Sequence, residues 1–302
     1  MKNGKTHRNY EARVSQLLDQ HEKKRHSLRD RFRLFAHATA NAMGSHWAFI
    51  VAVLVIVVWA VVSHGAKAIS WDFITKPAPE GVGPNLVGTG VIVGLATLMA
   101  APFGILIALF LSEYSGKRST RPVQLLMDVM NGLPSIIIAV FIFALLVAHK
   151  GQAGWKASVA LAIIMVPLIA RGTQEVLRLV PSHQREAADA LGVARWRSVL
   201  TIILPAALPG IVTATLLSVA RAAGETAPLI LITSLAPGDS FQLNPLHAVP
   251  NVPVRIFQLS EEANPEGFTE AWGLSLILIA FILALGLGSR YLLNRSKRKM
   301  TR

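Results

Sequence analysis

Long apolar stretches dominate this chain, and they constrain its fold more than any other feature. A helix that crosses the hydrocarbon core of a bilayer needs about 20 mostly apolar residues. The sequence predicts six such helices, at about 47–66, 85–111, 123–147, 155–170, 199–235 and 271–293. Hydrophobic residues make up 52% of the chain and the mean hydropathy is +0.47, which excludes an ordinary soluble domain of 302 residues. We therefore expect an all-α, polytopic membrane protein.

Glycine and proline residues modify several of the predicted helices. Gly132 and Pro134 interrupt the third helix, and Gly224 interrupts the fifth. Backbone groups freed by such breaks must find partners inside the protein or in a wet interior. Gly90 and Gly94 give the second helix a small-residue face, which predicts close contact with another helix.

Charged residues indicate on which side of the membrane each loop lies. Ten Lys or Arg residues precede Trp47. The loops 112–122 and 171–198 and the tail are also basic, through Lys117, Arg118, Arg121, Arg171, Arg178, Arg185, Arg195, Arg197, Arg295, Lys297, Arg298, Lys299 and Arg302. The loop 236–270 instead carries Asp239, Glu261, Glu262, Glu266 and Glu270 against the single Arg255. The positive-inside rule places both termini and the loop 171–198 in the cytoplasm, as an even number of spans requires.

The net charge of +13 does not indicate a nucleic-acid partner. The basic residues lie at the ends of the chain and in short loops, and the N-terminal ones are mixed with Glu11, Asp19, Glu22 and Asp30. This distribution favours a cytoplasmic segment that lies near anionic lipid, and we expect membrane lipid rather than nucleic acid as its partner.

A pattern of fixed spacing lies in the basic loop before the fifth helix. It reads Glu186-Ala187-Ala188, three residues, Gly192, nine residues, then Ile202-Ile203-Leu204-Pro205. Gly192 is suited to the turn that ends a helix, because a positive φ is cheap only for glycine. Glu186 offers a charge and the alanines a slim face to a second protein. Coincidental spacing in an amphipathic loop is the alternative, and six matched positions argue against it.

Arg221 and Glu225 place two charges inside the fifth apolar stretch. Arg221 lies sixteen residues beyond Pro205, or about 24 Å along a helix, which puts it within the membrane. A charge there costs about 2.5–3.5 kcal/mol on insertion scales and normally faces a cavity or a partner. Glu225 can orient the guanidinium, which matches tetrahedral oxyanions bidentately. A purely architectural ion pair, or an Arg221 that reaches the outer surface, are the alternatives.

Other polar residues are weaker candidates for the same path. Asn131 and Ser135 flank the break at Pro134, where we expect them to line it. Thr226 follows Glu225 directly. Arg171 lies at the inner end of the fourth helix and is either a ligand or a positive-inside anchor. Asp128 is expected to pair with a neighbouring base.

Several kinds of chemistry are excluded by the residues present. The chain has no cysteine, its nine histidines show no metal spacing, and no Ser-His-Asp arrangement is recoverable. The phosphate-binding pattern G-x4-G-K-[ST] is absent; Ser115-Gly116-Lys117-Arg118-Ser119 lacks the first glycine and the serine directly after lysine. We therefore expect neither a cofactor in this chain nor ATP hydrolysis by it.

Residues 47–293 resemble a known family of membrane proteins. The pattern at 186–205 is similar to the coupling loop of ABC import permeases. The stretches Val180-Pro181, Ala220-Arg221-Ala222-Ala223-Gly224-Glu225-Thr226-Ala227-Pro228-Leu229, Leu111-Ser112-Glu113-Tyr114, Asn131-Gly132-Leu133-Pro134-Ser135-Ile136 and Asn251-Val252-Pro253-Val254-Arg255-Ile256-Phe257 resemble the PstA-type permeases of the bacterial phosphate-specific transport (Pst) system. The basic N-terminal segment is longer than the family pattern. The resemblance implies a type I, MetI-like importer fold in the bacterial cytoplasmic membrane.

The same resemblance implies partners and residue roles. It implies inorganic phosphate as substrate, a homologous PstC-like permease, two PstB-like ATPase subunits that bind ATP and magnesium, and a PstS-like phosphate-binding protein. Arg221 and Glu225 match the family residues that are important for phosphate movement. Arg185, Glu186, Ala187, Ala188 and Gly192 match the loop that docks on the ATPase. A permease for another oxyanion or small solute, and the PstC-type paralogue, remain alternatives.

We thus divide the chain into three parts. Residues 1–45 form a basic cytoplasmic segment, 46–293 the six-span permease domain, and 294–302 a basic cytoplasmic tail. The coupling loop is 182–205 and the outer loop is 236–270. A secondary transporter would need no such coupling loop and usually shows an internal repeat, and a membrane-bound enzyme or sensor would need a catalytic constellation or an output domain.

The predicted topology can be tested with introduced cysteines, because the chain has none of its own. A cysteine at Ser182 should resist an impermeant thiol reagent in intact cells, whereas one placed in 236–270 should react. Labelling of the cysteine at Ser182 in intact cells would overturn the orientation.

Overall fold

The computed structural model describes residues 46–113, 118–262 and 264–300, and it contains helices and loops but no strand in these ranges. The chain divides into two units, Met1–Ala60 and Val61–Arg302. Most of helix α2, His46–Gly65, is the described part of the first unit. Its apolar side chains from Phe49 to Trp59 are exposed, as suits a helix that lipid or a partner covers. The predicted basic segment 1–45 lies outside the described residues.

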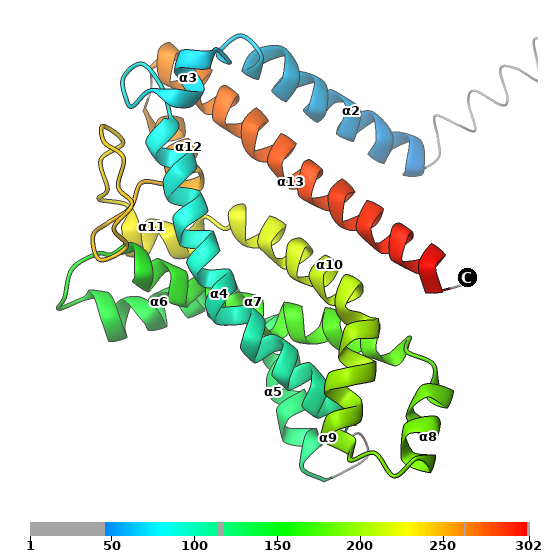
Figure 1. The fold of residues 1–302 in the computed structure, drawn as a ribbon. Helices are drawn as coiled ribbons and strands as arrows, with labels where there is room; N and C mark the ends of the chain where they lie inside the picture. The colour runs from blue at the N-terminus through cyan, green and yellow to red at the C-terminus, as the bar shows by residue number, and fades with distance from the viewer. Residues whose placement is uncertain (1–45, 114–117, 263, 301–302) are drawn as a thin grey trace, which may run out of the picture. The chain divides into compact units, whose positions relative to one another are not determined.

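The second unit is a series of long and short helices (Figure 1). They are α3 (Trp71–Thr75), α4 (Gly83–Glu113), α5 (Thr120–Gly132), α6 (Ser135–Ile142), η1 (Phe143–Val147), α7 (Gly154–Arg178), α8 (Ser182–Ala190), α9 (Arg195–Ser198), η2 (Val199–Ile203), α10 (Leu204–Ala223), α11 (Ala227–Thr233), α12 (Val252–Glu261) and α13 (Pro265–Met300). Both η1 and η2 are π-helical.

Within the described residues, four helices are long and apolar enough to cross a membrane. They are Gly83–Glu113, Gly154–Arg178, Arg195–Ala223 and Pro265–Tyr291. The pair α5 and α6–η1 passes the same test as one broken span, which raises the number to five. The all-α membrane fold is confirmed, whereas the number of six spans stays a prediction. The last helix is longer than predicted: the sixth span was expected to end at 293, whereas α13 continues to Met300.

Both predicted interruptions are real breaks in the helices. The axis bends by 99° between Thr120–Gly132 and Ser135–Val147. Leu133, which precedes Pro134, is extended with φ −72° and ψ 132°, because the proline ring disfavours a helical residue before it. The fifth predicted stretch also does not run through to 235: α10 ends at Ala223, and a separate α11 follows.

Helix α7 packs against both α4 and α10. The Ser158 hydroxyl donates to the Ile92 carbonyl of α4 at 2.9 Å. On the other side, Gly210 of α10 lies so close to α7 that an added methyl group would be 2.4 Å from Val176 Cγ1. Buried apolar side chains of α4 and α7, among them Ile92 and Leu161, form the main core. These contacts fix α7 between its two neighbours.

Within the second unit, the described helices do not make the close contact predicted at Gly90 and Gly94. No described atom outside the local helix lies within 4 Å of a methyl group added at either glycine. Both glycines instead line an open apolar groove of about 620 Å³ between α4, α10 and α13. The small-residue face thus has no partner among the described residues.

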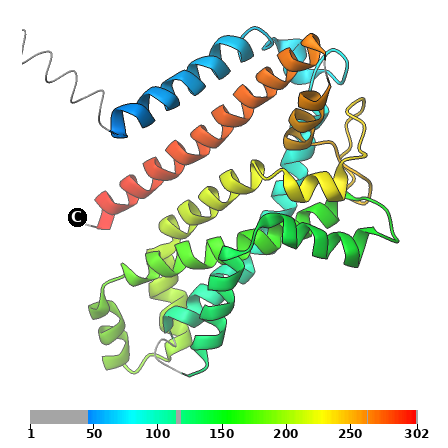
Figure 2. The same cartoon turned by 180° about the vertical axis from the view of Figure 1, so that it is seen from behind.

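The two ends of the second unit carry different loops. Helices α8 and α9 lie at one end, and α3 and α12 lie at the other (Figure 1 and Figure 2). The coupling loop and the outer loop are therefore separated along the long helices, as the predicted topology requires.

Candidate functional site

Arg221 lies in the last turn of α10, on a helix that is continuous from Leu204. This continuity confirms the separation from Pro205 that the sequence predicts. A cation is favourable at this position, because the carbonyl end of a helix carries a partial negative charge. The Arg221 side chain is 60% exposed, so the protein leaves its guanidinium open to a ligand.

Glu225 is paired with Arg221 as expected, although the helix ends between them. The Arg221 Nε and Glu225 Oε1 atoms are 3.6 Å apart, and the Glu225 side chain is only 15% exposed. The chain turns at Gly224, where the backbone N–H groups of Gly224 and Glu225 donate to the Arg221 and Ala222 carbonyls. The carboxylate therefore holds one edge of the guanidinium and leaves its other N–H groups available.

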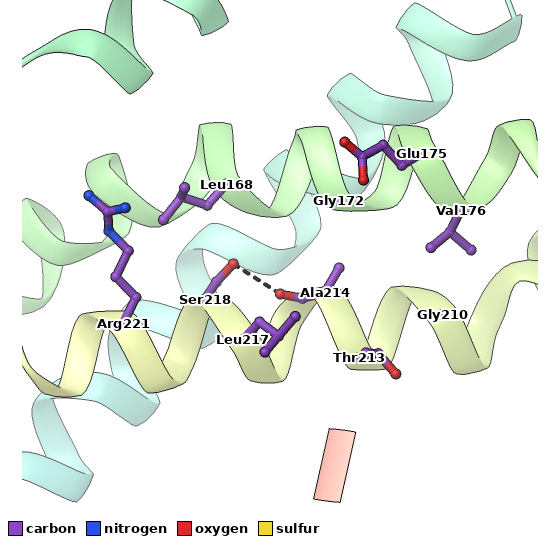
Figure 3. A pocket seen from close by; sticks show the side chains of 10 residues that line it. All are labelled: Leu168, Gly172, Glu175, Val176, Gly210, Thr213, Ala214, Leu217, Ser218 and Arg221. Carbon is purple, nitrogen blue, oxygen red and sulfur yellow. Dashed lines mark hydrogen bonds between the residues drawn. The ribbon is translucent and has the colours of Figure 1, made fainter. Parts of the chain in front are cut away.

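Arg221 lies between two cavities. The first, an open cavity of about 280 Å³, lies between α7 and α10, with Arg221 and Glu175 toward opposite ends (Figure 3). Its lining includes Leu168, Gly172, Thr213, Ala214, Leu217 and Ser218. The Ser218 hydroxyl donates to the Ala214 carbonyl of its own helix at 3.0 Å, so its hydrogen is already used. Arg221 is thus the strongest donor that this cavity offers to an anion.

The second cavity, of about 130 Å³, brings together three of the residues predicted from the sequence. Asn131, Ser135 and Arg221 all line it, although they come from α5, α6 and α10. Among the described residues, the buried Nδ2 atom of Asn131 has no hydrogen-bond partner. A buried amide donor without an acceptor is costly, by about 1–3 kcal/mol, unless a ligand or water accepts its hydrogen bond.

The N-terminus of α6 adds to the donor character of this second cavity. Ser135 is its first residue and Pro134 its N-cap, and no side chain caps the helix. The first N–H groups of a helix lack intrahelical acceptors and favour negative charge. The cavity therefore offers a guanidinium, an amide and a hydroxyl to one small oxyanion.

Arg171 and Thr226 lie apart from this donor set. Arg171 is paired with Asp128, and both side chains are about half exposed. This pairing confirms that Asp128 finds a neighbouring base. The pair lines a third cavity of about 200 Å³. Glu175 lines both this cavity and the first one. The Thr226 hydroxyl approaches the Gly224 carbonyl at 3.5 Å, within the turn that carries Glu225.

The residues 182–198, here called the coupling segment, form a helix, a turn and a short helix. Gly192 has φ +68°, as predicted for the turn between α8 and α9. Glu186 and Ala187 are exposed on α8, together with the large side chain of Leu191 beyond it. Ala188 follows Ala187 on α8 but faces the interior of the chain, where it is buried. Of the two alanines, only Ala187 is exposed on the surface of α8.

The sequence analysis missed the role of Glu113. Its side chain, only 7% exposed, lies 3.2 Å from Arg185 Nη2 of the coupling segment. A carboxylate at the end of an apolar span was visible in the sequence, but its partner is 72 residues away.

Among the described residues, no group of three or more His, Cys, Asp or Glu could hold a metal ion.

Comparison with known families and structures identifies relatives of this chain. Residues 100–302 match the family of binding-protein-dependent transport system inner membrane components. The phosphate transport system permease protein PstA 1 of Mycobacterium tuberculosis is 36% identical over 269 residues, which cover 83% of this chain and 86% of the relative. The phosphate transport system permease protein PstA of Haemophilus influenzae is 35% identical over 248 residues, which cover 80% of this chain and 87% of the relative.

Solved structures share the fold. A chain of a bacterial alginate ABC transporter superposes with a TM-score of 0.61 at 15% identity, covering 89% of this chain and 96% of that one. A chain of the MetNI methionine ABC transporter superposes with a TM-score of 0.57 at 18% identity, and the match covers 75% of this chain and 96% of that one.

The chain therefore belongs to the family of binding-protein-dependent transport inner membrane components, the permease subunits of ABC importers. Within this family it belongs with the PstA-type permeases. It is a multi-pass membrane protein and a transport subunit.

The exposure of Arg221 predicts that its ion pair contributes little to stability. Glu225 is mostly buried, but its partner Arg221 is 60% exposed and the two atoms are 3.6 Å apart, too far for a good hydrogen bond; such a pair stabilises a protein by about 0–1 kcal/mol, so Glu225→Gln should change the thermal midpoint of the purified complex only slightly. Glu270→Gln is the matched comparison. Arg255 and Glu270 share two hydrogen bonds of 2.9 and 3.1 Å, and their side chains are only 24% and 21% exposed. Loss of the Glu270 charge should lower the free energy of unfolding by about 1–3 kcal/mol. A larger fall for Glu225→Gln than for Glu270→Gln would contradict this assignment.

Proposed function

We propose that this chain is the phosphate-translocating permease subunit of an ATP-driven importer, and that Arg221 contacts the anion in transit. The observation that carries the proposal is the meeting of Arg221, Asn131 and Ser135 on one cavity from three separate segments. The relatives named for phosphate transport support phosphate as the substrate.

The donor set suits an oxyanion that must leave again. A guanidinium binds tetrahedral oxyanions through two N–H groups, and hydrogen bonds to such a charge are strong. A cluster of bases would hold phosphate too tightly for transport. The binding site has instead one arginine, and the Glu225 carboxylate, 3.6 Å from Arg221 Nε, competes with the anion for its guanidinium. Thr226 supports the turn that places this carboxylate.

Arg171 provides a second position on the inner side of the path. It lies on α7 one turn before Glu175, which lines both the cavity of Arg221 and that of Arg171. Along α7, Arg171 lies between Leu168, which is beside Arg221, and Glu175, so an anion that leaves Arg221 reaches Arg171 before this carboxylate. Asp128 then competes for Arg171 as Glu225 competes for Arg221.

The coupling segment connects the permease to its source of energy. Glu186 and Ala187, with Arg185 and Gly192 as support, dock on a PstB-like ATPase subunit, and the exposed Trp196 extends this surface. The importer contains two such ATPases, which bind ATP and magnesium, and a PstC-like permease as heterodimer partner. When the ATPases close, they move the coupling segments, and rigid helices carry the movement to the path.

The remaining partners follow from the topology. A PstS-like phosphate-binding protein delivers inorganic phosphate to the outer loop 236–270. The chain lies in the bacterial cytoplasmic membrane with both termini in the cytoplasm, where the basic residues lie near anionic lipid.

Phosphate uptake by variants of the whole complex tests the role of Arg221. Arg221→Lys keeps the charge but loses the planar fork, so uptake should fall at least about tenfold while the complex still assembles. Glu225→Gln should also impair uptake, because the guanidinium loses its competitor and its fixed orientation.

A purely architectural pair would give a different result. Each single substitution would then reduce the yield of complex, and the neutral double variant Arg221→Gln/Glu225→Gln would restore it. Uptake at the wild-type level by this double variant would show that the pair is scaffolding and that the site assignment is wrong.

A further inference from the structure

The carboxylate of Glu113 receives arginines from both arms of the coupling segment. Arg185, from α8, places its Nη2 atom 3.2 Å from Glu113 Oε1. Arg195, from α9, places its Nε atom 3.7 Å from Glu113 Oε2, and its Nη2 atom donates to the Glu113 backbone carbonyl. Glu113 is the last residue of α4. One buried side chain thus joins the end of a membrane helix to both sides of the turn at Gly192.

The turn at Gly192 is closed by backbone hydrogen bonds from Gly192 and Val193 to the Asp189 and Ala188 carbonyls, but these bonds do not reach the membrane helices. Gly192 joins them with φ +68°, and no other described atom lies within 4 Å of a methyl group added there. Arg195 starts α9, which continues through η2 into α10. Arg185 Nη2 also donates to the Leu177 carbonyl at 3.1 Å, so α8 is tied to α7 as well as to α4. Side-chain bonds from Arg185 therefore connect α8 to the membrane helices.

The burial of Glu113 gives this connection its strength. Its side chain is 7% exposed, against 30% for Arg185 and 60% for Arg195. A buried carboxylate that loses its partners keeps the penalty of desolvation without compensation. Moving the coupling segment away from α4 would leave Glu113 in that state. The end of α4 is thus expected to follow the segment.

We propose that Glu113 is a positioning residue that transmits movement of the coupling segment to the anion cavity. This rests on the proposed docking of that segment on an ATPase. Helix α4 packs so closely on α7 that a methyl group at Gly104 would lie 2.8 Å from the Ile169 side chain. The neighbouring Leu168 lines both cavities beside Arg221. A shift of α4 therefore changes the walls around the anion.

The test uses the whole complex with its partner subunits in liposomes. Glu113→Gln keeps the size of the side chain and removes its charge. We expect the complex to assemble and hydrolyse ATP, while phosphate moved per ATP falls about two- to thirtyfold, the range for residues that carry coupling. Glu80→Gln is the matched control, because Glu80 is an exposed carboxylate paired with Lys76. A structural role alone would lower the yield of complex and leave phosphate per ATP unchanged.

A distance measurement in the same complex separates the possible failures. Spin labels on cysteines at Leu106 of α4 and Asp189 of α8, both exposed, should give a narrow distribution that Glu113→Gln broadens. If wild-type complexes show no ATP-driven uptake, the proposed function fails and this distribution still decides whether Glu113 holds α8. If Glu113→Gln does not assemble, Arg195→Gln releases only the α9 arm and should still lower phosphate per ATP. An unchanged ratio together with an unchanged distribution would overturn the proposal.

Discussion

The close packing of α7 between α4 and α10 is the constraint on which the rest of the structure depends. Gly210 allows α10 to approach Val176 of α7, and Gly104 allows α4 to approach Ile169. Near these contacts α7 contributes Leu168 to both cavities beside Arg221, and Glu175 to the first of them and to the cavity of Arg171. A permease must change the shape of its path without unpacking its core. Helices packed at this density move together as rigid bodies.

Paired charges follow this framework along its length. Glu225 faces Arg221 beside the cavities, Asp128 faces Arg171 nearer the end that carries α8, and Glu113 is buried between Arg185 and Arg195. Exposure distinguishes their roles. The guanidinium of Arg221 is mostly open, which suits a group that exchanges its carboxylate for a passing anion. Glu113 is enclosed, which suits a permanent connection.

The sequence revealed those features that depend on local pattern. Hydropathy located the long helices, the spacing around Gly192 identified the coupling segment, and Arg221 was recognised as a charge within an apolar stretch. Features that depend on contacts between distant residues were not predictable in the same way. The joining of Glu113 to Arg185 and Arg195 spans 72 and 82 residues. Asn131 was a candidate on its own, but its meeting with Arg221 depends on the 99° bend at Pro134.

The most direct test of the account is the position of the anion in the assembled transporter. Electron cryomicroscopy of the complex trapped with phosphate during ATP turnover would locate it. We expect oxyanion density within hydrogen-bond distance of the Arg221 guanidinium and of the Asn131 Nδ2 atom, which has no acceptor among the described residues. Density that lies elsewhere along the path, away from both side chains, would contradict the central claim.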